Sequence, residues 1–131
     1  MNKTERYYEL SKQLKDVESR PYLKTLRKDN KLHVRERLDY LLDPDTFVED
    51  GLFARYEDPK LATDAVVTGI GKIDGRPVCI MANDMTIKAG TWGKVTIEKI
   101  IRIQEKAKQI IYHINQNTEF HGIIYRGLQF L

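Results

Sequence analysis

The loop Lys88-Ala-Gly-Thr-Trp-Gly is the part of the sequence whose residue types and spacing best suit chemistry. Glycines ahead of a helix let backbone N–H groups approach an anion or an oxyanion, and the helix dipole favours negative charge at the same place. The spacing of Gly90 and Gly93 does not follow GxGxxG, and no Gly-Lys-Ser or Gly-Lys-Thr follows, so dinucleotide binding and nucleotide hydrolysis are not supported. Two interpretations stay open: a loop that binds a negatively charged group, and a plain turn between strand and helix in which Trp92 packs as an anchor.

Other polar residues form weaker patterns. Asp64 and the pair Asn83-Asp84 flank two predicted strands and would suit acid–base chemistry as a carboxylate pair. Asn and Asp after a strand more often bond backbone groups in a turn, and no third partner is present to shift a pKa, so we do not expect this pair to act. His33, His113 and His121 lack carboxylate or cysteine partners at metal spacing, so we expect no metal site.

The composition of the 131-residue chain is typical of a globular domain. Its net charge of +3 comes from 22 basic and 19 acidic residues, a balance that gives no reason to expect a nucleic acid or an anionic membrane as partner. The single cysteine, Cys79, excludes an internal disulfide, and its place in a predicted strand favours a small buried apolar role. No apolar segment is long enough to cross a bilayer, and the amino terminus lacks a signal-peptide core, so we expect a soluble cytoplasmic protein.

A hairpin and a helix are predicted on either side of the loop. Two apolar runs, Ala65–Ile70 and Val78–Asn83, flank the sequence Ile73-Asp74-Gly75-Arg76. Asp-Gly between such runs is typical of a type I′ turn, which needs positive φ at both central residues. Beyond the loop, Thr96 predicts a helix cap, because apolar residues then recur with a period near 3.6. Those residues are Ile97, Ile100 and Ile101, followed by Gln104.

The sequence before the hairpin predicts helices joined by polar connectors. Arg6–Leu14 carries Tyr7, Leu10 and Leu14 on one helical face, and Pro21 interrupts this helical arm. Val34–Leu42 predicts a second helix that Asp43-Pro44 ends. A set of apolar residues after it is expected to anchor the chain ahead of the sheet: Phe47, Val48, Leu52 and Phe53.

Several strings match one known family in their order and spacing. They are Arg35-Glu-Arg-Leu-Asp, Leu41-Leu-Asp-Pro-Asp-Thr-Phe-Val-Glu, Val67-Thr-Gly-Ile-Gly-Lys-Ile-Asp-Gly-Arg-Pro-Val, Ala82-Asn-Asp, Gly90-Thr-Trp-Gly, Thr96-Ile-Glu-Lys-Ile and Arg102-Ile-Gln-Glu-Lys-Ala. Over roughly residues 10–109 the sequence resembles the amino-terminal domain of the carboxyltransferase β subunit of biotin-dependent acyl-CoA carboxylases. The Gly-Thr-Trp and Ala-Asn-Asp strings are most similar to the propionyl-CoA and methylcrotonoyl-CoA carboxylase type.

The resemblance implies an α+β fold, a partial crotonase-like spiral of ββα units preceded by N-terminal helices. Residues 1–60 would form a helical arm and connector, residues 61–109 the first ββα unit, and residues 110–131 a divergent tail. After Gln109 the family continues into a strand and a glycine motif whose amides form the acyl oxyanion hole. Ile110–Asn115 fits the strand here, but no glycine pair follows it, so we expect a truncated spiral.

The family transfers a carboxyl group from carboxybiotin, carried by a partner protein, to the α carbon of an acyl-CoA. The resemblance implies paired backbone N–H donors that stabilise an enolate, with no side-chain nucleophile, metal or directly bound cofactor at this half-site. Because the glycine motif and the second domain are absent, we expect a fragment that is inactive alone. Two alternatives stay open: a non-catalytic module that binds acyl-CoA or docks on an intact carboxylase, and the product of a damaged gene.

The resemblance also implies which residues contact acyl-CoA. The loop residues Lys88, Ala89, Gly90, Thr91 and Trp92 would form a wall of the acyl-CoA pocket. Arg35 would approach the coenzyme A phosphates, and the basic stretch of residues 24–31 is either a solvated surface or a second phosphate contact. The expected partners of the intact protein are a biotin carboxylase, a biotin carrier subunit and further copies of itself.

A spiral that stops after one unit leaves apolar surface uncovered, because each unit packs against the next. We therefore expect Ile97, Ile100 and Ile101 to be partly exposed, and the chain to self-associate or to be marginally stable. The apolar segments Ile110–Ile114 and Gly122–Leu131 are candidates for additional strands.

Overall fold

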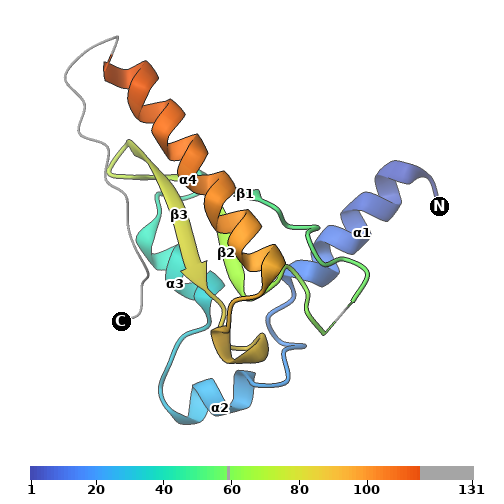
Figure 1. The fold of residues 1–131 in the computed structure, drawn as a ribbon. Helices are drawn as coiled ribbons and strands as arrows, with labels where there is room; N and C mark the ends of the chain where they lie inside the picture. Colours follow the sequence, from blue (N-terminus) through green and yellow to red (C-terminus); the bar gives the residue numbers. More distant parts are fainter. Residues whose placement is uncertain (59, 116–131) are drawn as a thin grey trace.

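The computed structural model describes residues 1–58 and 60–115, which form helices around a small antiparallel sheet (Figure 1). Three helices come first: α1 (Lys3–Lys15), α2 (Leu23–Lys28) and α3 (Val34–Leu41). The strands are β1 (Val48–Asp50), β2 (Val66–Ile73) and β3 (Arg76–Asn83), followed by the short 3-10 helix η1 (Lys88–Gly90) and by α4 (Lys94–Asn115). The predicted helical arm, the second helix and the ββα unit are all present.

The predicted hairpin is confirmed, including its turn. β2 and β3 pair antiparallel in the sheet order β1-β2-β3, with Ile73 opposite Arg76 next to the turn. Asp74 and Gly75 have φ values of 49° and 77°, as a type I′ turn requires. The Asp43 carboxylate, just after α3, accepts the N–H groups of Asp74 and Gly75 at 2.9 and 2.7 Å. The turn is therefore held both by its own residue types and by a long-range contact.

The sheet separates two helices, with α3 on one face and α4 on the other (Figure 1). One core cluster joins α3 to the face of the hairpin that carries Val67, Val78, Ile80 and Ala82. A second cluster lies beneath the end of α1 and includes Leu14, Leu52 and Ile87. Both sides of β2 are buried, since Val66 and Val67 are inaccessible to solvent. The hairpin therefore fixes the position of the loop that follows it relative to α3 and α4.

Strand β1 was not predicted, and one expected anchor is wrong. Val48 is 71% exposed and lies on the edge strand that pairs with β2. Phe47 and Phe53 pack against the two core clusters as expected, and Leu52 is buried. A three-residue segment is too short to show the alternation that predicts a strand. Its pairing depends instead on Thr68, Gly69 and Ile70 further along the chain.

Helix α4 begins earlier and ends later than the sequence pattern predicts. It starts at Lys94, so Thr96 lies inside the first turn, where its hydroxyl accepts the Gly93 N–H and donates to Asp64. It continues to Asn115, so the predicted strand at Ile110–Asn115 is wrong. No glycine or proline interrupts the sequence between Lys94 and Asn115, and a helix continues without a residue that stops it. Gly122–Leu131 lies outside the described residues.

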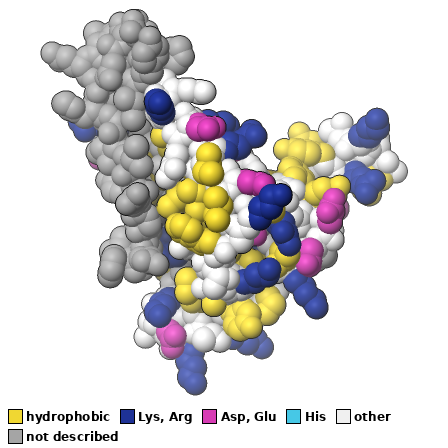
Figure 2. Space-filling view, in the orientation of Figure 1, with side chains coloured by type: hydrophobic (Ala, Val, Ile, Leu, Met, Phe, Trp, Pro, Cys, Tyr) yellow, Lys and Arg dark blue, Asp and Glu magenta, His cyan; other side chains and the backbone are white. Residues whose placement is uncertain are grey.

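The exposed side of α4 carries two isoleucines. Ile97 and Ile101 are each about half exposed, as predicted, whereas Ile100 is buried against the sheet. In Figure 2, hydrophobic side chains form a patch on the face where Figure 1 places α4. Within residues 1–58 and 60–115, no helix combines the length and the apolar character needed to cross a membrane.

Gly69 is required where β2 pairs with β1. A Cβ atom at Gly69 would lie 2.5 Å from the Val48 carbonyl oxygen and 2.5 Å from a ring carbon of Phe47. We predict that Gly69→Ala lowers the free energy of unfolding by about 2 kcal/mol, because the backbone of β1 must move. Gly71→Ala is the matched control, since the atoms nearest to its Cβ would be the terminal carbons of the Leu42 side chain rather than backbone, at 3.0 and 3.1 Å. Equal urea midpoints for the two variants would contradict this account.

Candidate functional site

The loop between β3 and α4 contains a left-handed turn. Lys88, Ala89 and Gly90 have φ values of 46°, 53° and 75° in succession. Residues other than glycine avoid this region at a cost of about 1–2 kcal/mol each. Local bonds hold the turn, because the Gly90 N–H donates to the Ile87 carbonyl at 2.8 Å and the Thr91 N–H to the Lys88 carbonyl at 3.1 Å. Strained residues of this kind cluster at active sites and ligand-binding loops.

The loop presents apolar and cationic side chains to solvent. Trp92 is 54% exposed, and its indole N–H donates to the Asn83 side-chain oxygen at 3.4 Å, so Trp92 is not a buried anchor. Met85 is also about half exposed, and a Cβ at Gly90 would lie 2.7 Å from its sulfur. Lys88 is exposed as well. The loop therefore offers a ring, a thioether and a positive charge to a ligand.

Backbone donors lie next to these side chains. The first intrahelical bond of α4 runs from the Ile97 N–H to the Gly93 carbonyl at 3.1 Å. The amides of Lys94, Val95 and Thr96 precede that bond and have no acceptor within the helix. The Gly93 N–H is already bonded to the Thr96 hydroxyl, at 3.0 Å. The start of α4 suits a negatively charged or carbonyl oxygen.

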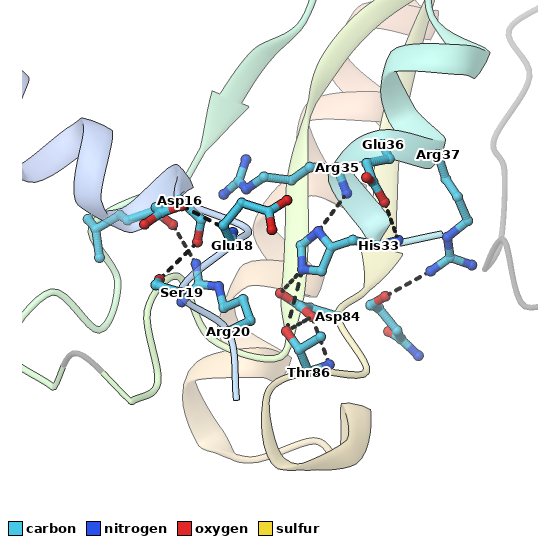
Figure 3. A network of polar contacts seen from close by, with 12 residues as sticks. Asp16, Glu18, Ser19, Arg20, His33, Arg35, Glu36, Arg37, Asp84 and Thr86 are labelled. Atoms are coloured by element: carbon cyan, nitrogen blue, oxygen red, sulfur yellow. Dashed lines mark hydrogen bonds and ion pairs between the residues drawn. The ribbon is translucent and has the colours of Figure 1, made fainter. Parts of the chain in front are cut away.

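A buried polar network lies at the start of the loop (Figure 3). The Oδ1 atom of Asp84 accepts both the N–H and the hydroxyl of Thr86, at 2.9 and 2.5 Å. Its Oδ2 atom lies 3.2 Å from Nε2 of His33, whose side chain is fully buried. Nδ1 of His33 accepts the Arg35 N–H at 3.2 Å, which leaves Nε2 as the nitrogen that donates to Asp84. Burial alone would raise the pKa of Asp84, but the hydrogen bonds from His33 and Thr86 hold it below its ordinary value.

His33 has a carboxylate partner in the fold, Asp84. Spacing could not reveal Asp84, because the two residues meet only when α3 packs on the hairpin. Asp64 accepts a hydrogen bond from the Thr96 hydroxyl rather than pairing with Asp84. Among the described residues, no group of three His, Cys, Asp or Glu side chains could hold a metal ion. Cys79 is half-buried on β3, and burial raises the pKa of its thiol.

The guanidinium of Arg35 is already engaged within the chain. It makes two hydrogen bonds to the Glu49 carboxylate on β1, at 2.7 and 3.0 Å, whereas the loop follows β3 on the opposite edge of the sheet. The pair borders a groove of about 600 Å³ in which acidic side chains outnumber basic ones. Those side chains are Glu36, Asp39, Asp43, Asp45 and Glu49, against Lys15 and Arg35. A phosphate is poorly matched to that groove.

In the basic stretch, Arg27 is engaged and three lysines are exposed. The Arg27 guanidinium makes two hydrogen bonds to the Glu36 carboxylate, at 2.7 and 2.5 Å, and so connects α2 to α3. Lys24, Lys28 and Lys31 lie on the surface. The solvated interpretation therefore accounts for most of this stretch, and any phosphate contact would fall to the lysines.

Replacing Arg35 alone should be destabilising. We predict that Arg35→Met lowers the free energy of unfolding by about 2 kcal/mol, because the buried Glu49 carboxylate loses its partner. The double variant Arg35→Met, Glu49→Leu removes both charges and should recover most of the loss. Urea denaturation of the three proteins tests this, and equal losses in the single and double variants would show that the pair is not responsible.

Lys99 is a buried cation that the sequence analysis missed. Its side chain is 4% exposed, and Nζ donates to the carbonyls of Thr63 and Val66 at 2.5 Å each. Burial lowers its pKa from 10.5 to about 8. Its spacing in the sequence indicates burial, because Lys99 lies on the same helical face of α4 as the buried residues Ile103 and Ala107.

Comparison with known proteins identifies the family. The sequence pattern of the carboxyl transferase domain matches residues 26–126 and so continues past Gln109. The chain belongs to the carboxyl transferase domain family. It is 54% identical over 89 residues to an uncharacterized carboxylase of Bacillus subtilis, YngE, a match that covers 68% of this chain and 17% of that protein. It is 47% identical over 89 residues to the mitochondrial methylcrotonoyl-CoA carboxylase beta chain of Arabidopsis thaliana, covering 65% of this chain and 15% of that one.

The fold agrees with this assignment. The crystal structure of transcarboxylase 12S, a hexamer solved with hydrolysed methylmalonyl-coenzyme A, superposes with a TM-score of 0.71 at 29% identity. That match covers 82% of this chain and 23% of the transcarboxylase chain. The prediction of a partial crotonase-like carboxyltransferase fold is therefore confirmed. The carboxyl transferase chain described here spans about a sixth of the length of its curated relatives.

Proposed function

We propose that this chain forms the acyl-CoA-facing amino-terminal part of a biotin-dependent acyl-CoA carboxyltransferase. The observation that carries the proposal is the strained turn Lys88–Gly90, which holds exposed Lys88 and Trp92 beside the amino terminus of α4. Family membership supplies the reaction, in which a carboxyl group passes to the α carbon of an acyl-CoA. Biotin on a partner protein would supply that carboxyl group, and we assign none of the described residues to it.

In this proposal the loop binds and orients the ligand. Trp92 and Met85 pack along its apolar part, and Lys88 pairs with a phosphate. The free amides at the start of α4 lie where a negatively charged oxygen is stabilised by the helix dipole. The chain's contribution is thus positional and electrostatic.

We further propose that this chain alone does not transfer a carboxyl group. Enolate stabilisation needs paired N–H donors, and losing one donor in comparable oxyanion sites costs about 2.7–4 kcal/mol. Residues 110–131 contain Gly122 and Gly127 but no adjacent glycine pair. Binding without turnover is therefore the expected behaviour.

Calorimetric titration with propionyl-CoA and with free coenzyme A tests the proposal. We expect micromolar binding of propionyl-CoA that weakens about tenfold in Lys88→Ala and in Trp92→Ala, which is 1.4 kcal/mol. Lys108→Ala is the control, because Lys108 is an exposed lysine far along α4 from the loop. Arg35 is unsuitable as a single probe, since its removal unpairs Glu49. A folded chain that binds neither compound would contradict the proposal.

A further inference from the structure

We infer that the buried network of His33, Asp84 and Thr86 is a positioning device: it sets the left-handed turn at Lys88–Gly90 and thereby the loop's affinity for acyl-CoA. The inference rests on the proposed function for its ligand, but its structural part does not depend on it. None of the three side chains is accessible enough to touch a ligand itself, because each is at most 3% exposed. They act through the loop that follows them.

The first step runs from Asp84 into the loop. Asp84 is the residue directly after β3, and its side chain fixes Thr86 by two bonds, through the N–H and the hydroxyl. The Asp84 carbonyl then accepts the Ile87 N–H at 3.2 Å, and the Ile87 carbonyl accepts the Gly90 N–H at 2.8 Å. Asp84 thus holds Thr86 through its carboxylate and Ile87 through its carbonyl, and the bond between Ile87 and Gly90 extends this support to the end of the turn.

The second step explains why the turn needs this support. Lys88 and Ala89 have positive φ, so the turn is unfavourable by itself. Ile87, immediately before them, is buried in the core cluster beneath α1, so the turn has a fixed starting point. Because Thr86 and Ile87 are both fixed, the backbone reaches Lys88 in a single orientation. The contacts around the turn therefore maintain its strained conformation.

The third step connects the network to α3. His33 caps this helix, since Nδ1 accepts the Arg35 N–H and the His33 N–H donates to the Glu36 carboxylate at 2.7 Å. The other ring nitrogen donates to Asp84. The charges of Arg20 and Arg37 also act on Asp84, and the Arg20 guanidinium is held in place by the Leu14 carbonyl at 2.6 Å. In Figure 3 the dashed lines that reach Asp84 come from His33 and Thr86. The loop is thereby fixed relative to α3 as well as to the sheet.

Trp92 makes the inference measurable. It is the single tryptophan of the chain, so its fluorescence reports on the loop alone. Lys88 provides a second reporter, because trypsin cleaves after lysine and needs an adaptable loop. These two readouts describe the loop, and propionyl-CoA affinity describes its function.

The test compares variants inside and outside the network. Asp84→Asn removes the negative charge of the carboxylate, and Thr86→Val removes the hydroxyl, each with little change in side-chain shape. Both should shift the Trp92 emission, speed cleavage after Lys88 several-fold, and weaken propionyl-CoA binding about tenfold. Thr86→Ser keeps the hydroxyl and should restore all three values. Leu38→Ala removes a buried apolar side chain of α3 outside the network, so it should lower stability while leaving the three values unchanged.

Two results would overturn the inference. The first is wild-type emission, cleavage and affinity in folded Asp84→Asn and Thr86→Val. The second is the same set of changes in Leu38→Ala, which would show that any loss of stability disturbs the loop. If the unaltered chain does not bind propionyl-CoA, the proposed function fails, while emission and cleavage still decide whether the network positions the loop.

Discussion

Replacing His33 by alanine is expected to lower the free energy of unfolding by about 3–5 kcal/mol. The substitution removes the side-chain cap of α3 and leaves the buried Asp84 carboxylate without its imidazole donor. It also leaves a cavity, because His33 is fully buried. The urea midpoint should fall while the slope of the transition stays unchanged, since the surface exposed on unfolding is nearly the same.

A second variant separates the two roles of His33. Asparagine is a good N-cap residue but is too short to reproduce the imidazole contact, so His33→Asn should recover only about 1 kcal/mol of the loss. A His33→Ala protein within 0.5 kcal/mol of the wild type, about the range of surface substitutions, would show that the His33–Asp84 contact is not a stabilising pair. Full recovery in His33→Asn would assign the whole effect to the cap.

Stability is expected to rise with pH in alkaline solution because of Lys99. Burial lowers its pKa to about 8 in the folded chain, from 10.5 in an unperturbed lysine. The carboxylates of Glu49, Asp64 and Asp50 oppose this shift, and Arg35 reinforces it. Between pH 8 and pH 10.5 the unfolded chain binds the additional proton, so the free energy of unfolding increases by about 3 kcal/mol across that interval.

The sign of the Lys99 effect makes it easy to test. Below pH 8 both states carry the proton, and Lys99 should add no pH dependence. Tyrosines and other lysines titrate in the same alkaline range, so the measurement is the difference between the wild type and Lys99→Met at each pH. That difference should grow in favour of the wild type from pH 8 upward. A constant difference would mean that Lys99 keeps an ordinary pKa despite its burial.

Features that depend on neighbouring residues could be predicted from the sequence. The hairpin turn required only that Asp74 and Gly75 adopt positive φ, and both do. The family resemblance was equally accessible, because it rests on strings of residues in order. The helix start was predicted less well, since Thr96 has the chemistry of a cap but uses its hydroxyl to contact Gly93 and Asp64 within the first turn.

Features that depend on distant residues could not be predicted. β1 forms because Val48–Asp50 pairs with β2, and a segment of three residues shows no sequence pattern that predicts this pairing. His33 and Asp84 meet only through the packing of α3 on the hairpin. Arg35 was a reasonable phosphate ligand by its residue type, but its guanidinium is bonded to Glu49, whose carboxylate is buried. Tertiary contacts, rather than local preference, decide these positions.

The backbone amide signals of the isotopically labelled chain, followed by NMR during titration with propionyl-CoA, would locate the ligand residue by residue. Acyl-CoA binding by the loop predicts that the largest saturable shifts fall on Lys88–Trp92 and on the first turn of α4, and that Lys88→Ala weakens them. Saturable shifts confined to the acidic groove beside Arg35 and Glu49, or no shifts in a folded chain, would contradict the assignment of the loop as the acyl-CoA contact.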